Sequence, residues 1–312
     1  MLMNKQPIVS ILAISFNHEQ FVVETLDSII NQDYPNVELI IVDDCSSDRT
    51  AEVIEQWKKD RNVDCVFIAH KENKGVCYSL NEALSHANGT YYQGISCDDI
   101  LLPSKISTQV NAFNELDDDV AVLHSDAIVI DEDSKVTHPS FYEFWNFPTG
   151  TTQNEFKRLI LQNTIIAPTV LTKVEIYRSL GFYDENLSYE DWDKWLRISK
   201  KYKIIKLDTP LTQYRHFSTS MSQGKRYRKV ILEDSIVLLD KHRGISKEID
   251  ALVNEAQRPR ITELIENNDA KLGHLWKKLK YEKSAYSLFL FLCGLVGLDQ
   301  KQSHAIKNKL KR

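Results

Sequence analysis

Short apolar runs alternate with segments of helical periodicity over the first hundred residues. A continuous run of apolar, often β-branched residues indicates a buried strand, and apolar residues that recur every three or four positions indicate an amphipathic helix. The predicted strands are Ile8 to Ser15, Val37 to Val42, Cys65 to His70 and Tyr91 to Ser96, and the predicted helices are Glu24 to Asn31, Ala51 to Trp57 and Val76 to Ala87. This alternation predicts an α/β fold with a parallel sheet that helices cover on both faces.

Two pairs of adjacent aspartates end two of the predicted strands. Asp43 and Asp44 follow the second strand, and Asp98 and Asp99 follow the fourth. Because parallel sheets bind ligands at the carboxyl ends of their strands, we expect both pairs at one edge of the sheet. Neighbouring carboxylates repel each other, so a cation or a set of hydrogen-bond donors is expected beside them. An ordinary turn and a helix N-terminus remain the alternative explanations for the two pairs.

The rest of the chain is less regular. It is predicted to contain a helix from Ser104 to about Leu116, a strand from Val120 to His124, an irregular aromatic segment from Phe141 to Gly150 and a helix that begins near Gln153. A cluster of acidic and aromatic residues (YEDWD, residues 189–193) leads into a further helix, and after Ser222 the sequence is mostly charged and helical. We therefore divide the chain into residues 1–103, 104–222 and 223–312.

Composition and charge narrow the possible partners. The 312 residues include 39 Lys and Arg against 44 Asp and Glu, a formal net charge of -5, which predicts no general affinity for nucleic acid or anionic membrane. The five cysteines are an odd number without CxxC spacing, and no signal peptide precedes the first apolar segment. We therefore expect free thiols and a cytoplasmic location, and neither a disulfide framework nor a zinc site.

No glycine-rich phosphate loop follows the first predicted strand. That strand runs into FNHEQF, whereas a dinucleotide-binding site needs glycines there for the close approach of a pyrophosphate. A P-loop lysine motif is also absent from the sequence. If phosphates bind at this acidic edge, they must do so through a divalent metal ion that carboxylates hold.

Four segments together resemble the family 2 glycosyltransferases of the GT-A fold. They are VSILAISFNHEQFVVETLDSIINQDYPNVELIIVDDCSSDRT, ENKGVCYSLNEAL, SCDDILLP and YEDWDKWLRI, which occur in the family's order and at similar intervals between Pro7 and Ser222. The resemblance implies a Rossmann-like sandwich with a mostly parallel central sheet, here followed by a helical C-terminal extension. It also makes residues 1–103 the nucleotide-sugar-binding half, and residues 104–222 the acceptor-binding and catalytic half.

The resemblance also implies site residues. The family's base-binding Asp falls on Asp44, with Asp43 beside it, and the general base falls on Asp191. The last Asp of the metal-binding DxD element falls on Asp98, and Ser96 stands where its first Asp would be. The predicted donor-binding residues are Ser15, Asn17, Asp43, Asp44, Asn73, Gly75, Asn81 and Asp98, and the predicted ligands of Mn²⁺ or Mg²⁺ are Asp98, Asp99 and His216. His216 lies one position before the expected histidine, and Leu80 replaces an arginine often found in the family.

Transfer of a sugar from a nucleotide sugar needs one cation and one general base. A departing diphosphate gains negative charge, which a divalent cation stabilises, and the acceptor hydroxyl must lose a proton to a nearby carboxylate, here Asp191. By resemblance this is a single displacement with inversion of the anomeric carbon. At helical spacing Asp193 is expected to face away from Asp191 into solvent, while Trp192 and Trp195 are expected in the core, with sugar stacking as the alternative.

The predicted function is transfer of a sugar from a nucleotide sugar, a UDP-sugar, to a hydroxyl of a glycan or lipid-linked acceptor in cell-surface polysaccharide synthesis. Two alternatives stay open: a catalytically idle nucleotide-sugar-binding module, and a nucleotidyltransferase. The sequence does not name the sugar, the acceptor or the linkage.

An apolar run near the C-terminus raises a separate question. Tyr286 to Leu298 (YSLFLFLCGLVGL) is too short to cross a bilayer, which needs about 20 residues. Lysines flank it on both sides. The segment is predicted to be either a helix packed on the main domain or a peripheral contact with the cytoplasmic face of a membrane.

Overall fold

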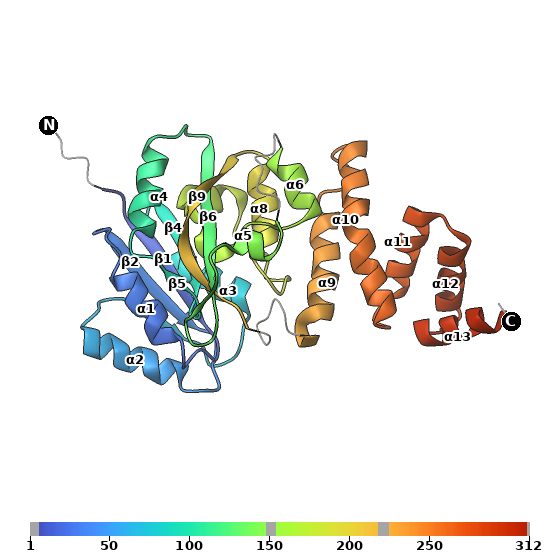
Figure 1. Cartoon of the computed structure of the whole chain (residues 1–312), viewed down its shortest axis with the longest axis horizontal. Coiled ribbons are helices and arrows are strands. Elements are labelled where there is room, and N and C mark those ends of the chain that lie inside the picture. Colours follow the sequence, from blue (N-terminus) through green and yellow to red (C-terminus); the bar gives the residue numbers. More distant parts are fainter. Residues whose placement is uncertain (1–5, 148–153, 218–224, 311–312) are drawn as a thin grey trace. The chain divides into compact units, whose positions relative to one another are not determined.

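The computed structural model describes residues 6–147, 154–217 and 225–310 (Figure 1). The chain divides into two compact units. The first consists of residues 1–159 and 164–218, and the second of residues 160–163 and 219–312. Each unit is described by itself below.

The first half of the α/β unit follows the predicted alternation of strands and helices. Its elements are β1 (Val9–Ser15), α1 (Val22–Ile30), β2 (Val37–Asp43), α2 (Thr50–Arg61), β3 (Val66–Ala69), α3 (Val76–His86) and β4 (Tyr91–Ser96). All four predicted strands and all three predicted helices are present, with boundaries that differ by a few residues.

The second half is less regular and contains strands that the sequence did not indicate. Its elements are β5 (Ile100–Leu101), α4 (Lys105–Asn114), β6 (Val120–Ile130), β7 (Val136–His138), α5 (Phe141–Phe144), α6 (Glu155–Leu161), the short 3₁₀ helix η1 (Ala167–Thr169), β8 (Leu171–Lys173), α7 (Val174–Leu180), α8 (Asp191–Ser199) and β9 (Lys203–Arg215). The segment expected to be irregular from Phe141 begins as helix α5, and its residues 148–150 lie outside the described residues.

One mixed sheet joins both halves of the unit. The strand order is β3-β2-β1-β4-β8-β6-β9-β5, and β7 pairs with β6. The pairs β1–β2, β1–β4, β2–β3 and β6–β9 are parallel, whereas β8 and β5 run antiparallel to their neighbours. The sheet is therefore mixed, with β5, β7 and β8 antiparallel to their neighbours, and its parallel core agrees with the mostly parallel central sheet that the family resemblance implied.

Helices cover both faces of the sheet, and alternate strand residues point to the two faces. Ile11 and Ile41 pack with side chains of α1, α2 and α4, while Leu12 and Ile40 pack with side chains of α3 and α7. Successive side chains of a strand point to opposite faces, so a strand buried on both faces is apolar throughout. This explains why β1 and β2 were recognisable from their continuous apolar runs.

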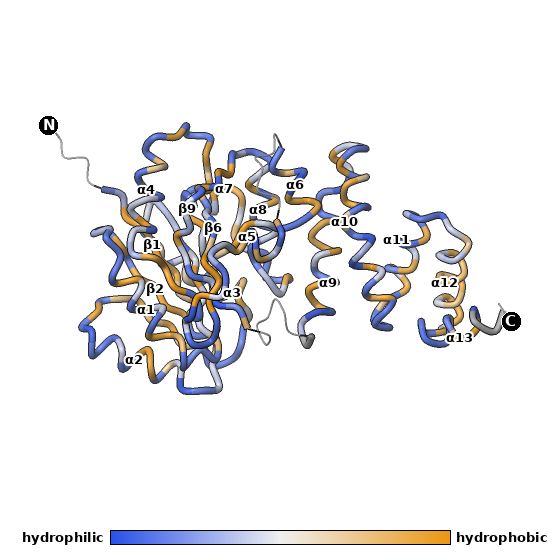
Figure 2. Tube along the Cα trace, viewed as in Figure 1, coloured by the Kyte–Doolittle hydropathy of each residue, from blue (hydrophilic) through white to orange (hydrophobic). Residues whose placement is uncertain are grey.

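The second unit is helical. Its helices are α9 (Lys225–Asp240), α10 (Lys247–Glu266), α11 (Leu272–Glu282), α12 (Ala285–Leu295) and α13 (Gln300–Leu310). Its core includes Leu232 of α9, Leu264 of α10, Leu275 of α11 and Leu290 of α12. Figure 2 shows α12 as mainly orange and white, the colours of apolar and intermediate residues. Among the described helices, none is long and apolar enough to cross a membrane.

Candidate functional site

The strand register brings the two acidic pairs to one edge of the sheet. Ser15 of β1 pairs with Asp43 of β2, and Ile14 of β1 pairs with Ser96 of β4. The backbone N–H of Cys97 donates to the Ile14 carbonyl at 2.9 Å. The segments that begin at Asp43 and Cys97 therefore leave the sheet at the same edge, and the end of β1 lies between them.

Asp43 fixes the loop that follows β2. Its carboxylate is buried, with 2% of the residue exposed, and accepts hydrogen bonds from the Ser15 hydroxyl at 2.8 Å and the Ser46 hydroxyl at 2.5 Å. The Ser46 backbone N–H donates to its other oxygen at 2.9 Å. Asp43 and Ser15 thus join the ends of β1 and β2, and the stability of the β2 loop depends on both.

Asn17 joins the loops after β1 and β2 from the solvent side. Its side-chain oxygen accepts from the Ser47 backbone N–H at 2.7 Å, and its own N–H donates to the Ser46 hydroxyl at 2.8 Å. Its φ of +58° lies in the left-handed region, which asparagine tolerates better than most residues. Asn17 is exposed, so it stands at the surface of this edge.

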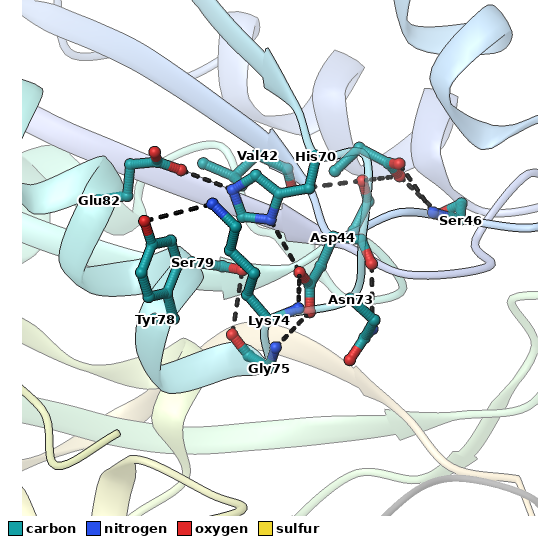
Figure 3. A network of polar contacts seen from close by, with 12 residues as sticks. Val42, Asp44, Ser46, His70, Asn73, Lys74, Gly75, Tyr78, Ser79 and Glu82 are labelled. Carbon is teal, nitrogen blue, oxygen red and sulfur yellow. Dashed lines mark hydrogen bonds and ion pairs between the residues drawn. The ribbon is translucent and has the colours of Figure 1, made fainter. Parts of the chain in front are cut away.

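The Asp44 carboxylate holds the turn that leads into α3 (Figure 3). The backbone N–H groups of Lys74 and Gly75 donate to its two oxygens, each at 2.8 Å, and the Asn73 side chain donates to the Asp44 carbonyl at 3.0 Å. Gly75 has a φ of +86° and a ψ of 158°, a conformation that is essentially restricted to glycine. Asp44, from the first of the segments that resemble the family, and Asn73 and Gly75, from the second, therefore form one structural feature.

His70, which the sequence analysis did not select, completes this network. Its Nδ1 atom lies 2.8 Å from Asp44 Oδ1, and its Nε2 atom lies 2.6 Å from Glu82 Oε2 on α3 (Figure 3). Only 3% of the side chain is exposed. The one available signal was its position at the end of a predicted strand, since the pairing with Glu82 depends on the tertiary structure.

Contacts from α3 bring the segment before Asp191 close to the Asp44 turn. The Asn81 side chain accepts from the Tyr183 backbone N–H at 2.9 Å and donates to the Tyr183 carbonyl at 3.1 Å. The Cys77 thiol donates to the Leu187 carbonyl at 3.3 Å. The predicted site residue Asn81 therefore positions this segment.

Asp191 is the first residue of α8. Its Oδ1 atom accepts from the Trp192 backbone N–H at 2.5 Å. Burial is the main cause of the raised pKa of the Cys77 thiol, and the charges of Glu190, Asp184 and Asp191 raise it further. Burial, and secondarily the charge of Asp191, raises the pKa of Glu190 to about 8. Glu190 thus holds a proton at neutral pH beside Asp191.

The aspartates of the second pair have different environments. Asp98 is partly exposed, and its Oδ2 atom lies 3.8 Å from His18 Nε2. Asp99 is buried, and its Oδ1 atom accepts from the Arg215 backbone N–H at 2.8 Å. Burial and the charge of Asp98 hold the pKa of Asp99 well above its usual range. Asp98 is therefore the carboxylate of this pair that solvent or a ligand can reach.

Arg215, also missed by the sequence analysis, ties the Asp98 turn to the rest of the sheet. Its guanidinium is fully buried and donates to the carbonyls of Asp98 and Asp131 at 2.7 and 2.8 Å. It also forms an ion pair with Glu24 of α1 at 2.7 Å and lies over the Phe21 ring, 4.6 Å from its centroid. One side chain at the end of β9 therefore connects the Asp98 turn, the β6–β7 turn and α1.

His216 lies directly after Arg215, in an aromatic environment. Its ring packs edge-on against Phe144 and Trp145, with centroid distances of 5.2 and 5.9 Å. Burial, with a contribution from His138, lowers the pKa of His216, so the imidazole is mainly neutral at pH 7. Its Nδ1 atom is buried, and no partner for it occurs in the described part of the chain.

The structure does not gather the three predicted metal ligands into one set. Over residues 6–147, 154–217 and 225–310, no three His, Cys, Asp or Glu side chains are grouped so that they could hold a metal ion. Asp99 faces the Arg215 backbone, and Ser96, which replaces the first Asp of the family element, is exposed at the end of β4. Asp98, Asp99 and His216 stay predicted ligands, of which Asp98 is the most accessible carboxylate.

Several expectations about neighbouring residues are settled. Asp193 is buried and not solvated, because Arg197 of the same helix donates to it at 2.8 Å. Trp192 and Trp195 lie in the core as expected, with 4% and 2% exposed. Leu80, at the position of the family's arginine, is also a core residue. All five cysteines are free thiols, as the sequence predicted.

The family model of glycosyl transferase family 2 matches residues 10–181, more than half of the chain. The protein is a member of this family. The match begins in β1 and ends after α7, so it includes both acidic pairs and the Asp44 turn.

Relatives of this family 2 protein are named as glycosyltransferases. The chain is 26% identical over 230 residues to TuaG of Bacillus subtilis, named for teichuronic acid biosynthesis, which covers 71% of this chain and 84% of TuaG. It is 31% identical over 202 residues to EpsE of the same organism, covering 62% and 68%. An uncharacterized glycosyltransferase of Rickettsia typhi is 29% identical over 201 residues, which cover 63% of this chain. The match spans only 61% of that relative's length.

Solved structures confirm that this family 2 protein has a GT-A-like fold. Staphylococcus aureus TarS, in complex with UDP-GlcNAc, matches with a TM-score of 0.59 at 18% identity over 92% of this chain and 81% of that chain. The mannosyltransferase PcManGT of Pyrobaculum calidifontis, in complex with GDP-Man and Mn²⁺, matches with a TM-score of 0.60 at 16% identity over 99% and 89%. At these identities the likeness shows the fold alone.

Proposed function

We propose that this protein is an inverting glycosyltransferase that moves a sugar from a UDP-sugar to a hydroxyl of a glycan or lipid-linked acceptor in the cytoplasm. The observation that carries the proposal is the strand register, which places Asp43 and the Asp98 turn at the carboxyl edge of a family 2 sheet. Open α/β sheets bind their ligands at this edge. Residues 1–103 would form the donor half, 104–222 the acceptor and catalytic half, and 223–312 a helical extension.

The loops after β1 and β2, together with the Asp44 turn, would form the donor subsite. Asn17 is exposed there, and the backbone of residues 73–75 is fixed by Asp44. Recognition of a nucleobase needs hydrogen-bonding groups in fixed positions. The buried hydrogen bonds of Asp43 and Asp44 would keep the loop after β2 and the turn before α3 in place. The TarS complex with UDP-GlcNAc supports a uridine donor, and the PcManGT complex with GDP-Man provides the competing donor for the test.

A divalent cation at the Asp98 turn would have Asp98 as its accessible protein carboxylate. Asp98 is partly exposed, and the His216 ring presents a buried, unpartnered nitrogen next to Arg215, whose backbone binds Asp99. Mn²⁺ or Mg²⁺ would take its remaining ligands from the diphosphate and water. The Mn²⁺ in the PcManGT complex supports this assignment. When bound, such a cation would stabilise the charge of the departing diphosphate.

Asp191 would remove the proton of the acceptor hydroxyl. It lies at the N-terminus of α8, where the positive end of the helix dipole favours a carboxylate. The proton held by Glu190 at neutral pH removes a like charge beside it. As a general base, Asp191 would have to be in its ionised form.

Nucleotide-sugar binding and turnover test the proposal together. UDP-sugars with Mn²⁺ or Mg²⁺ should raise the melting temperature more than GDP-sugars, since a ligand that binds only the folded state stabilises it. With an acceptor present, Asp191→Asn should lower kcat by about 10² to 10⁴-fold and leave the donor Kd nearly unchanged. Absence of any stabilisation by nucleotide sugars with either cation would contradict the donor assignment.

The catalytically idle binding module is the second candidate, and Ser96 is the observation that favours it. The exposed serine replaces a carboxylate that would help hold the cation. This candidate predicts that nucleotide sugars bind and that Asp191→Asn changes no measurable activity. A turnover that depends on Asp191 would exclude it.

A further inference from the structure

Helix α12 carries an apolar stripe that the second unit leaves uncovered. Leu288, Leu292, Leu295 and the C-cap residue Val296 expose 45%, 51%, 54% and 74% of their surface. Their spacing places them on one face of the helix. The opposite face is buried, because Leu290 and Cys293 are only 2% and 7% exposed. Helix α12 is therefore apolar on both its core face and its outer face.

Helix α11 extends this stripe. Trp276 is 53% exposed, and its ring lies 5.2 Å from the Phe291 ring of α12. Trp276 and Leu288 line one shallow open pocket, which Lys280 and Lys283 also border. We call the exposed side chains of Trp276, Leu288, Leu292, Leu295 and Val296 the α11–α12 apolar face. It combines aliphatic side chains and one indole, and Lys280 and Lys283 lie beside it.

The charge of this part of the chain is opposite to that of the whole. Residues 271–312 contain nine lysines and one arginine, with Glu282 and Asp299 as their only acidic residues, in a chain of formal net charge -5. The remaining residues are therefore strongly acidic. The positive charge is concentrated in the stretch of sequence that supplies the apolar face, which favours an anionic partner there.

Lys280 and Lys283, beside the apolar face, differ from the neighbouring lysines of α11 in their ion pairs. Lys277 pairs with Asp240, and Lys278 pairs with Glu282 at 2.5 Å. Lys280 and Lys283 are exposed, and within the described residues neither has a carboxylate partner. Their charges are consequently available to an external anion.

We propose that the α11–α12 apolar face docks on an anionic phospholipid surface, with α12 lying in the plane of the headgroup region. Interfacial helices typically carry leucines and tryptophans that enter the boundary of the acyl chains, and lysines that lie at the level of the phosphates. Helix α12 has 11 residues, about 16 Å at 1.5 Å per residue, too few to span a bilayer. The inference does not rest on the proposed activity, since docking needs neither donor nor acceptor.

A lipid surface fits better than a second copy of this chain. In a two-fold symmetric pair the same patch meets itself, so Lys280 and Lys283 would face their own counterparts. Unpaired like charges at such an interface oppose association. An anionic bilayer satisfies both the lysines and the leucines.

Flotation of the full-length protein with vesicles tests the docking. We expect binding to vesicles of equimolar phosphatidylglycerol and phosphatidylcholine, little binding to pure phosphatidylcholine, and a blue shift of tryptophan emission that Trp276→Phe removes. The double variant Lys280→Gln with Lys283→Asn should lower the partition coefficient on anionic vesicles by about 30-fold. Leu292→Ser with Val296→Ser should lower it by about tenfold.

Matched controls keep the result specific. Lys59→Gln with Lys201→Gln removes two exposed lysines of the α/β unit, and Val237→Ser removes an exposed apolar side chain of α9; neither should change vesicle binding. The proposal would be overturned if the protein bound anionic and pure phosphatidylcholine vesicles equally well, or if it bound neither. So would a wild-type dimer in light scattering that Leu292→Ser with Val296→Ser dissociates, because the face would then join two copies.

Discussion

The Nδ1 atom of His70 lies 2.8 Å from the Oδ1 atom of Asp44, inside a network that also includes Glu82 (Figure 3). His70 comes directly after β3, Asp44 directly after β2, and Glu82 from α3. The imidazole therefore joins three successive elements through two carboxylates. It also supports the carboxylate that holds the backbone of Lys74 and Gly75.

Replacing His70 should weaken donor binding more than it weakens catalysis. We expect His70→Ala to lower the free energy of unfolding by about 2 kcal/mol, because the buried carboxylate of Asp44 and the partly exposed carboxylate of Glu82 each lose a hydrogen-bond partner. The donor KM should rise while kcat changes little, since His70 acts only through the Asp44 turn. His70→Gln, which can still donate to Asp44, should recover part of the donor affinity. His86→Ala, an exposed histidine of α3, serves as the control, and an equal rise in KM there would contradict this role.

Replacing Arg215 should destabilise the α/β unit. Its buried guanidinium has Glu24 and two backbone carbonyls as partners, so Arg215→Ala is expected to cost about 3 to 5 kcal/mol in urea unfolding. Arg215→Lys keeps the charge but loses the fork of donors, and it should recover only part of the loss. An exposed arginine, as in Arg49→Ala, should change stability by less than about 0.5 kcal/mol. A stable Arg215→Ala protein with unchanged donor affinity would show that the contacts of the Arg215 guanidinium are dispensable.

The Asp98 turn offers a test in both directions. Asp98→Asn should raise the Mn²⁺ concentration for half-maximal donor binding by at least about tenfold, because it removes the accessible carboxylate. Ser96→Asp should lower that concentration, since Ser96 is exposed at the end of the same strand. Ser104→Asp adds the same charge at the N-cap of α4 and should have no effect on the Mn²⁺ titration. If the Ser104 and Ser96 variants behave alike, general charge and not ligation explains the change.

The raised pKa of Glu190 gives the protein a pH-dependent stability with a definite sign. The unfolded chain ionises this carboxyl near 4.5, whereas the folded protein keeps its proton up to about 8. Between these values the unfolded state binds fewer protons, so stability falls as the pH rises, by at most about 1.4 kcal/mol per pH unit.

Glu190→Gln should therefore flatten the stability profile between about pH 4.5 and 8, as measured by denaturant unfolding at a series of pH values. Glu175→Gln, an exposed glutamate of α7, should leave the slope unchanged. A Glu190→Gln profile as steep as that of the wild type would assign the slope to other groups.

The sequence predicted the strands that are buried on both faces. β1, β2 and β4 are mostly apolar and end in polar side chains, so the strands and the edge that carries Asp43 and Asp98 could be inferred. β9 could not, because lysines and Pro210 interrupt its pattern, and it forms through long pairing with β6. Its existence depends on the tertiary structure.

In the candidate site, too, some residues could be predicted from the sequence and others depend on the tertiary structure. Resemblance selected Asp44, Asn73 and Gly75, and the structure joins them in one turn. His70 and Arg215 have no motif of their own, and their partners lie 12 or more residues away in sequence, so spacing could not reveal them. Asp193 was assigned to solvent from helical geometry alone, because packing against the rest of the unit is not visible in a single helix.

The hydrogen bonds of Asp43 and Asp44 have one more consequence. Ordering a free loop on binding costs roughly 1 to 2 kcal/mol of backbone conformational entropy per residue. Here the end of β1, the residues after β2 and the residues before α3 are restrained by hydrogen bonds to the buried carboxylates of Asp43 and Asp44. A ligand at this edge would meet a rigid surface, and its affinity would not be reduced by the cost of folding that surface around it.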